Sequence, residues 1–224
     1  ANEPDGYNIN QDCGTESTAA LVEAVIKHKA NAGIAFDGDG DRLVMVDEAG
    51  NILDGDRILF LLARHRQQTG ALAGGVVGTI MSNYGFEKSL GRYGIDLCRT
   101  QVGDRHVLEE LRSRGWCLGG EPSGHIVCFD KTTTGDGVVA ALQVLNAMVS
   151  TDKALSLLTG DLDNYPQARA NVTLSLDRVS LSSVVSGARV QQMVSEVESS
   201  LGADGRVVVR CSGTEPVVRV MVEG

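Results

Sequence analysis

Hydrophobic and polar positions follow two periods along this chain, and their order predicts strands that alternate with helices. Positions 18, 21, 22, 25 and 26 lie on one face of a helix, with Ser17 or Thr15 as its predicted cap. Apolar runs at 33–36 and 42–46 predict two short strands, and a helical period covers 55–68. The "DGDGD" stretch between the two runs is therefore expected on a loop between strands.

The alternation continues through the middle of the chain. Strands are predicted at 74–81, 96–102, 116–120 and 125–129, and helices at 86–93, 104–114 and 135–149. Strands that alternate with helices are typical of βαβ units, so the expected fold class is α/β, layered around a mixed sheet.

The pattern changes near Tyr165 and Pro166. After this point a strand is predicted at 171–176, then a serine-rich connection, a helix at 187–201, and strands at 205–210 and 217–223. The link "CSGTEP" between the last two strands predicts a hairpin. We expect a separate, small α+β unit of roughly 60 residues at this end of the chain.

Composition narrows the class of protein. The chain has 224 residues and a formal net charge of −9, which argues against a general nucleic-acid binder because such proteins usually present a basic face. Five cysteines without a C-x-x-C pair indicate neither a zinc cage nor a disulfide framework, and favour a reducing cytoplasm. No apolar run approaches the roughly 20 residues of a membrane span. The first residues, "ANEPDGYNIN", lack a starting methionine and resemble an interior loop, so we expect that the beginning of a longer protein is missing.

The first candidate for chemistry is "GIAFDGDGDRLVMVD", in which Asp37, Asp39 and Asp41 alternate with glycine. Three carboxylates so close together repel one another unless a cation lies between them. Ligands that are all oxygen favour magnesium, calcium or manganese over zinc. The alternative is a solvated acidic turn, since Asp-Gly is ordinary turn chemistry.

An EF-hand loop is a second alternative, with Asp37 first and Glu48 twelfth. Its sixth position requires glycine, but this chain has Arg42 there. The predicted flanking elements are also strands, whereas an EF-hand has helices.

The stretch "GGEPSGHIVCFD" places Glu121, Ser123 and His125 two residues apart. In an extended backbone these side chains would face the same way, and a carboxylate beside a hydroxyl suits the neighbouring hydroxyl groups of a sugar. The alternative is a Pro-Ser-Gly turn between strands, with His125 as an ordinary hydrogen-bonded residue.

The stretch "RVVVRCSGTEPVVRV" combines cations, hydroxyls and a glycine. Arginine can bind a phosphate through two charge-assisted hydrogen bonds, and exposed backbone N–H groups around a glycine can complete a phosphate cradle. The alternative is a plain hairpin loop flanked by strand arginines. "VGDRHV" adds two further cations, Arg105 and His106, with a surface charge at a helix start as the alternative for either. The candidate phosphate ligands are Arg210, Ser212, Gly213, Thr214 and Arg219.

These stretches, taken in order, resemble the α-D-phosphohexomutase superfamily across essentially the whole chain. "GVVGTIMSN" and "DKTTTGDGVVAALQVL" belong to the same resemblance, and "DKTTTGDG" is similar to the branch that acts on glucosamine phosphate. The resemblance implies four domains around one cleft, of which this chain would supply the C-terminal part of the second at 1–52, the third at 53–160 and the fourth at 161–224.

The resemblance also implies roles for individual residues. Asp37, Asp39 and Asp41 would bind Mg²⁺, with Arg42 beside the reacting phosphoryl group. Arg105, Glu121, Ser123 and His125 would bind the substrate, and His125 would also hold or transfer a proton there. The phosphate that is not transferred would be held by the candidate phosphate ligands named above.

The active-site phosphoserine that the family carries in an S-A-S-H-N-P type loop is absent from these 224 residues. The implied reaction interconverts glucosamine 6-phosphate and glucosamine 1-phosphate through that phosphoserine, with glucosamine or glucose 1,6-bisphosphate as intermediate or activator. We therefore expect this chain alone to be inactive. The expected partners are a small sugar phosphate and, as an option, a second copy in a homodimer, with neither nucleic acid nor membrane. Mannose or glucose phosphates remain alternative substrates, and a non-catalytic binding module remains an alternative function.

Overall fold

The computed structural model describes residues 3, 5–174, 178–212 and 215–224. The chain forms two compact units, Ala1–Asp163 and Asn164–Gly224, and each is described by itself. The predicted division of the first unit at residue 52 remains a prediction.

The first unit begins with a helix and a small antiparallel sheet in which β2 lies between β1 and β3. The register pairs Phe36 with Leu43, so the carboxylate loop is the connection of a β-hairpin, as predicted. The predicted helix cap was wrong: the chain enters the helix after Thr18, past Ser17 and Thr15, and Thr18 makes no side-chain capping bond within the described part of the chain. These elements are α1 Ala19–His28, β1 Ala32–Phe36, β2 Leu43–Asp47 and β3 Ile52–Leu53.

A second, mixed sheet has the order β5-β4-β6-β7. Strand β4 is parallel to β5 and β6, whereas β6 and β7 form an antiparallel hairpin. The predicted α/β class with a mixed sheet is confirmed. Its elements are α2 Gly55–Gln68, β4 Val76–Thr79, α3 Tyr84–Gly91, β5 Leu97–Thr100, α4 Asp104–Arg114, β6 Leu118–Gly120, β7 Ile126–Cys128, α5 Gly137–Thr151 and α6 Leu155–Thr159.

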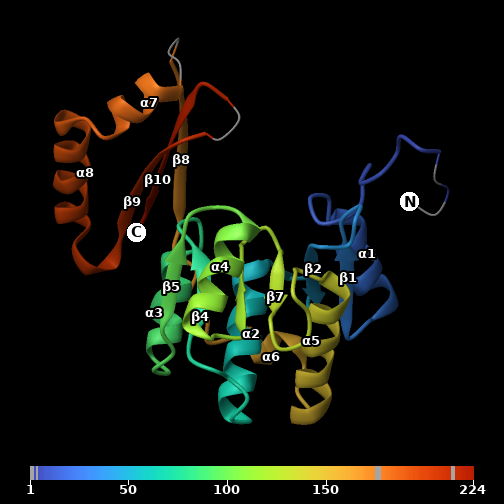
Figure 1. Cartoon of the computed structure of the whole chain (residues 1–224). Helices are drawn as coiled ribbons and strands as arrows, with labels where there is room; N and C mark the ends of the chain where they lie inside the picture. The colour runs from blue at the N-terminus through green and yellow to red at the C-terminus, as the bar shows by residue number, and fades with distance from the viewer. Residues whose placement is uncertain (1–2, 4, 175–177, 213–214) are drawn as a thin grey trace. The chain divides into compact units, whose positions relative to one another are not determined.

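Helices cover both faces of this sheet (Figure 1). Val107 and Leu111 of α4 pack with Val77 and Val127 in a small cluster, while buried residues of α2, α3 and α5 form the larger core on the other side. Helix α6 was not predicted, because five residues are too few to display a helical period. Among the described residues, none of the helices combines the length and apolar character needed to cross a membrane.

The second unit contains an antiparallel sheet of order β8-β10-β9 with two helices. The predicted hairpin is present, whereas the predicted serine-rich connection contains α7. In this helix the buried Leu181 is the first of three apolar residues at helical spacing i, i+3, i+4. The serines between them are weak helix formers, and for this reason the sequence pattern did not predict the helix. Positions 175–176 of the predicted strand lie outside the described residues. The elements are β8 Gln167–Thr173, α7 Arg178–Val185, α8 Ala188–Leu201, the 3₁₀ turn η1 Gly202–Asp204, β9 Arg206–Cys211 and β10 Val217–Glu223.

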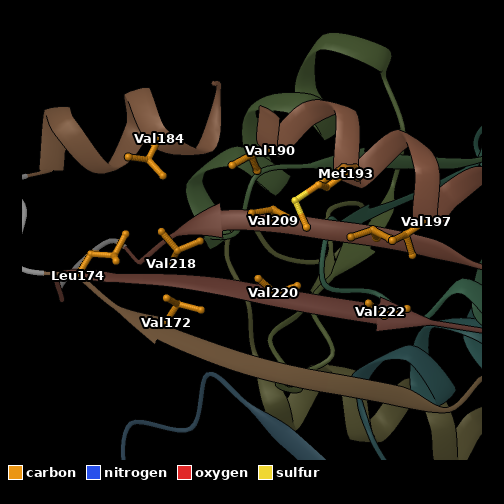
Figure 2. Close-up of a pocket in the computed structure, with 12 residues that line it drawn as sticks. Val172, Leu174, Val184, Val190, Met193, Val197, Val209, Val218, Val220 and Val222 are labelled. Carbon is orange, nitrogen blue, oxygen red and sulfur yellow. The ribbon is translucent and has the colours of Figure 1, made fainter. Parts of the chain in front are cut away.

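An apolar cavity of about 330 Å³ lies between the helices and the sheet of this unit. Figure 2 shows Met193 of α8 and Val209 of β9 on opposite sides of it. Alternate residues of β10, namely Val218, Val220 and Val222, also line it, as the period of two along a strand requires.

Candidate functional site

The three predicted metal ligands converge in the structure. Oxygen atoms of Asp37, Asp39 and Asp41 all lie within 4.8 Å of one another. The turn is closed by Gly40, whose N–H donates to the Asp37 carbonyl at 3.3 Å and whose φ of +77° suits glycine. The Arg42 N–H donates to Asp37 Oδ1 at 3.1 Å, so the loop's own backbone orients one of the carboxylates.

The electrostatics of this loop favour a cation. Partial burial and the neighbouring charge of Asp37 raise the pKa of the Asp41 carboxyl above its ordinary value. Asp41 Oδ1 is buried and accepts no hydrogen bond from any described residue. A small set of carboxylate oxygens, one of them without a donor, fits a hard divalent ion such as Mg²⁺. The EF-hand alternative is wrong, because the loop joins two strands and Glu48 instead hydrogen-bonds Ser156.

Arg42 and His125 lie beside the carboxylates. Arg42 Nε is 3.7 Å from Asp37 Oδ2 and 3.9 Å from Asp41 Oδ1. His125 is buried, with Nε2 3.7 Å from Asp41 Oδ2. The two residues also pair as an antiparallel β-bridge, so the structure brings both predicted catalytic residues to the carboxylate loop.

The 121–125 stretch is a turn between β6 and β7, so the alternative of a Pro-Ser-Gly turn is confirmed. Gly124 has a φ of +96°, and the extended backbone that would orient all three side chains alike is not present in this stretch. His125 is buried toward the carboxylate loop, whereas Ser123 is exposed. Glu121 Oε1 accepts the Gly103 N–H at 2.7 Å, and the Ser123 hydroxyl donates to Glu121 Oε2 at 3.5 Å. A carboxylate and a hydroxyl therefore lie side by side in this turn.

Arg105 lies on the exposed first turn of α4. Its Nε donates to Glu109 Oε1 at 2.7 Å. The hydrogen bond to Glu121 comes from Gly103, two residues before Arg105, and not from Arg105 itself. A sugar contact by Arg105 stays a prediction.

The sequence pattern did not single out the glycines that close the site. A Cβ on Gly135 would lie 2.2 Å from His125 Nε2, and one on Gly137 would lie 2.8 Å from the Arg42 carbonyl oxygen. The Gly137 N–H donates to the Gly40 carbonyl at 2.9 Å, which fixes the start of α5 against the carboxylate loop. "TGDG" was the available signal, since glycines that flank an aspartate before a helix often mark a close approach of backbone.

The candidate phosphate residues belong to the second unit. Arg210 and Arg219 are directly opposite each other in the register of β9 and β10. Burial, and then the charge of Arg219, lower the pKa of Arg210 below its ordinary value. Arg219 Nη2 contacts Glu215 Oε2 at 2.9 Å, while its buried Nε has no acceptor among the residues that the structure describes. Ser212 is buried next to them, and the candidates Gly213 and Thr214 lie outside the described residues.

Two models of known protein families match this chain. Residues 54–165 match the family model described as phosphoglucomutase/phosphomannomutase, alpha/beta/alpha domain III. Residues 175–224 match the model described as phosphoglucomutase/phosphomannomutase, C-terminal domain.

Curated relatives match the whole chain. It is 52% identical over 223 residues to a phosphoglucosamine mutase of Thiobacillus denitrificans, covering 100% of this chain and 48% of the relative. It is 53% identical over 221 residues to a phosphoglucosamine mutase of Nitrosococcus oceani, covering 99% of this chain and 48% of the relative. The chain thus spans about half the length of the curated relatives it matches.

Solved structures share the fold. A crystal structure of an N-acetylglucosamine-phosphate mutase in its product complex has a TM-score of 0.74 at 23% identity, over 96% of this chain and 50% of that one. The N-acetylphosphoglucosamine mutase of Aspergillus fumigatus, in complex with GlcNAc-6P and magnesium, has a TM-score of 0.74 at 20% identity, over 96% and 49%.

Proposed function

Because the chain belongs to the phosphoglucomutase/phosphomannomutase family, we propose that it supplies the metal, sugar and phosphate sites of a phosphoglucosamine mutase. The proposed reaction interconverts glucosamine 6-phosphate and glucosamine 1-phosphate through a phosphoserine and a bisphosphate intermediate. The observation that carries the proposal is the convergence of three carboxylates within 4.8 Å, next to Arg42 and His125. The substrate class follows the name that the curated relatives share.

Asp37, Asp39 and Asp41 would hold Mg²⁺. When bound, this ion neutralises charge on a phosphoryl group in transfer. Arg42, whose side chain is 42% exposed, can donate to the oxygens of that group. The buried His125 can hold or transfer a proton at Nε2, which faces Asp41.

Glu121 and Ser123 would bind the sugar hydroxyls. Glu121 Oε1 accepts the Gly103 N–H, and Oε2 accepts the Ser123 hydroxyl at 3.5 Å, a long contact that the hydroxyl groups of a sugar would replace. Arg105 would add a cation at the start of the neighbouring helix.

Arg210, Ser212 and Arg219 would hold the phosphate that is not being transferred, together with Gly213 and Thr214. Two arginines opposite each other on adjacent strands repel, and a phosphate dianion would relieve that repulsion. Binding energy from this remote phosphate would help to orient the reacting end of the sugar.

The proposal also covers cofactor, partner and location. Glucosamine or glucose 1,6-bisphosphate would serve as intermediate or activator, and a homodimer is one option for assembly. A cytoplasmic location fits the five scattered cysteines.

Phosphorus NMR tests the reaction on the protein as its source makes it. We expect glucosamine 6-phosphate to convert to glucosamine 1-phosphate in magnesium buffer, faster than the corresponding mannose or glucose phosphates convert. A clear preference for mannose or glucose phosphate would overturn the substrate assignment. Binding of the sugar phosphate without turnover, even with bisphosphate present, would instead indicate a binding module.

The 224-residue chain itself offers a second test. It contains no Ser-His-Asn-Pro stretch, so we expect it to bind Mg²⁺ and glucosamine 6-phosphate without turnover. Turnover by this chain would contradict the proposed phosphoserine mechanism.

A further inference from the structure

The first turn of α2 lies directly against the turn that carries Glu121. The Gly55 N–H donates to the Pro122 carbonyl at 3.1 Å. A Cβ on Gly55 would lie 1.9 Å from the Glu121 carbonyl oxygen and 3.0 Å from the Gly124 nitrogen. Since no side chain fits between them, the position of α2 determines where the backbone of Glu121 lies.

The next residue, Asp56, attaches this turn of α2 to the loop that follows β4. Its side chain is buried, with 3% of the residue exposed. Asp56 Oδ2 accepts the Asn83 N–H at 2.7 Å, and the Ser82 hydroxyl also hydrogen-bonds the carboxylate. Asn83 in turn caps α3, accepting the Gly85 N–H at 2.8 Å. The carboxylate therefore joins the beginnings of two helices.

Arg99 of β5 holds the same loop from its carbonyl side. Its Nη1 donates to the Ser82 carbonyl at 2.7 Å and to the Thr79 carbonyl at 3.0 Å, and its Nη2 contacts Glu87 Oε2 at 2.9 Å. The loop after β4 is thus fixed on both sides and gives Asp56 a rigid attachment point.

All these contacts lie at the carboxyl ends of the three parallel strands. Strand β4 ends at Thr79, β5 at Thr100 and β6 at Gly120, and Glu121 follows β6 directly. Ligands of open α/β sheets bind at this edge. The hydrogen bond from the Gly103 N–H to Glu121 Oε1 joins the loops that follow β5 and β6.

We propose that Asp56 is a positioning residue for Glu121. By fixing the first turn of α2 to the loop after β4, it holds Gly55 against the turn at 121–125, the proposed sugar-binding turn. This inference rests on the proposed function for the role of Glu121 toward the sugar. The positioning itself rests only on the contacts above.

The free energy that it costs to bury the Asp56 carboxyl group supports the proposal. Burial, and then the charge of Asp54, raise the pKa of the Asp56 carboxyl to about 7. Asp54, the N-cap of α2, and Arg99 of β5 are the charged groups that act on the carboxyl, and the Asn83 N–H and the Ser82 hydroxyl are its hydrogen-bond donors. Asp56 Oδ1 accepts no hydrogen bond within the described part of the chain. An apolar side chain would fill this space at lower cost, so a packing role alone does not account for a carboxylate.

Two variants and a control test the inference on the 224-residue chain. Asp56→Ala removes the acceptor, whereas Asp56→Asn keeps an oxygen that can accept the Asn83 N–H. The control is Ser89→Ala, since Ser89 is equally buried and accepts the Asp163 N–H at 2.9 Å, but makes none of these contacts to the sugar-binding turn. Amide hydrogen exchange is measured at Gly55 and Gly124, and affinity for glucosamine 6-phosphate is measured by calorimetry with MgCl₂.

We expect Asp56→Ala to speed exchange at Gly55 and Gly124 and to weaken glucosamine 6-phosphate binding, each by about tenfold, the effect of losing one buried hydrogen bond. Affinity for Mg²⁺ alone should stay unchanged. Asp56→Asn should restore both quantities, and Ser89→Ala should alter neither. Unchanged exchange in a folded Asp56→Ala protein would overturn the inference.

Asp56→Asn also decides the matter if the alanine variant does not fold. In the parent chain, the amide resonances of Gly55 and Gly103 should shift together between pH 6 and pH 8, and in Asp56→Asn this shift should disappear. A shift that persists in Asp56→Asn, or one that moves Gly55 without Gly103, would overturn the positioning role. A parent chain that binds no glucosamine 6-phosphate would count against the proposed function, while the exchange and the resonances would still decide the role of Asp56.

Discussion

Arg42 and His125 are paired in an antiparallel β-bridge that joins the carboxylate loop to the turn at 121–125. Beside this bridge, the Leu43 N–H donates to the Gly124 carbonyl at 2.9 Å. Both bridge residues also face carboxylates, Arg42 Nε at 3.7 Å from Asp37 and His125 Nε2 at 3.7 Å from Asp41. The two loops are therefore linked directly through their backbones, and a substitution in one loop should also change the stability or ligand affinity of the other.

Gly124→Ala should break this junction. The residue has a φ of +96°, and a Cβ would lie 2.2 Å from the Leu43 carbonyl oxygen. We expect the free energy of unfolding of the first unit to fall by about 1–3 kcal/mol or more, with weaker Mg²⁺ binding, since backbone strain and a clash add together. Urea unfolding followed by circular dichroism measures the first effect.

Gly91→Ala is the matched control. Gly91 ends α3, and a Cβ there would meet no atom within 4 Å outside its chain neighbours and its own helix backbone, so alanine should leave stability unchanged or raise it by up to about 1 kcal/mol. Equal losses in the two variants would contradict a specific role for Gly124.

Asp39→Asn tests the metal site. Removing one of three converging carboxylates should weaken Mg²⁺ binding by about tenfold or more, because ligand charge sets the affinity of such sites. Calorimetric titration with MgCl₂ measures it, with Asp152→Asn on the exposed C-cap of α5 as the control. In the protein as its source makes it, kcat should fall more than sugar-phosphate affinity. An unchanged Mg²⁺ affinity would refute the assignment.

The buried Asp56 predicts how stability depends on pH. Its pKa is raised from 3.8 to about 7 by burial, so between these values the folded chain retains a proton that the unfolded chain releases. The contribution of Asp56 to the free energy of unfolding should therefore be largest near pH 4 and fall by roughly 2–4 kcal/mol until about pH 7. Asp56→Asn should lack this part of the decline in urea titrations from pH 4 to pH 8. Identical pH profiles would show that Asp56 titrates normally.

Arg210→Gln tests the phosphate site of the second unit. Inorganic phosphate should raise the Tm of this unit, because an anion relieves the repulsion between Arg210 and Arg219. We expect Arg210→Gln to lower phosphate affinity by about tenfold or more, as for the loss of a charge-assisted contact. Arg189→Gln, on the exposed surface of α8, should have no such effect. If both variants respond to phosphate like the parent chain, the arginine pair is only part of a hairpin.

Periodicity alone located most of the elements. Helix α2 at Gly55–Gln68 and α4 at Asp104–Arg114 begin and end where the pattern predicted, because each keeps its apolar positions in register over three turns or more. The misses have local causes. Helix α6 is too short for a period, and the serines of α7 dilute one. The resemblance to the α-D-phosphohexomutase superfamily is confirmed by the family models.

The sequence by itself determined the acidic loop between two strands, the family, and the separate α+β unit. Those features depend on residue types and on their spacing over a few positions, and both can be read directly from the sequence. Only the tertiary structure decided that His125 faces Asp41, that Glu121 holds the Gly103 N–H, and that Asp56 is buried beside Asn83. Each of these pairs joins segments distant in the sequence. Such pairs are set by how the sheet edge brings its loops together, and no local period encodes that.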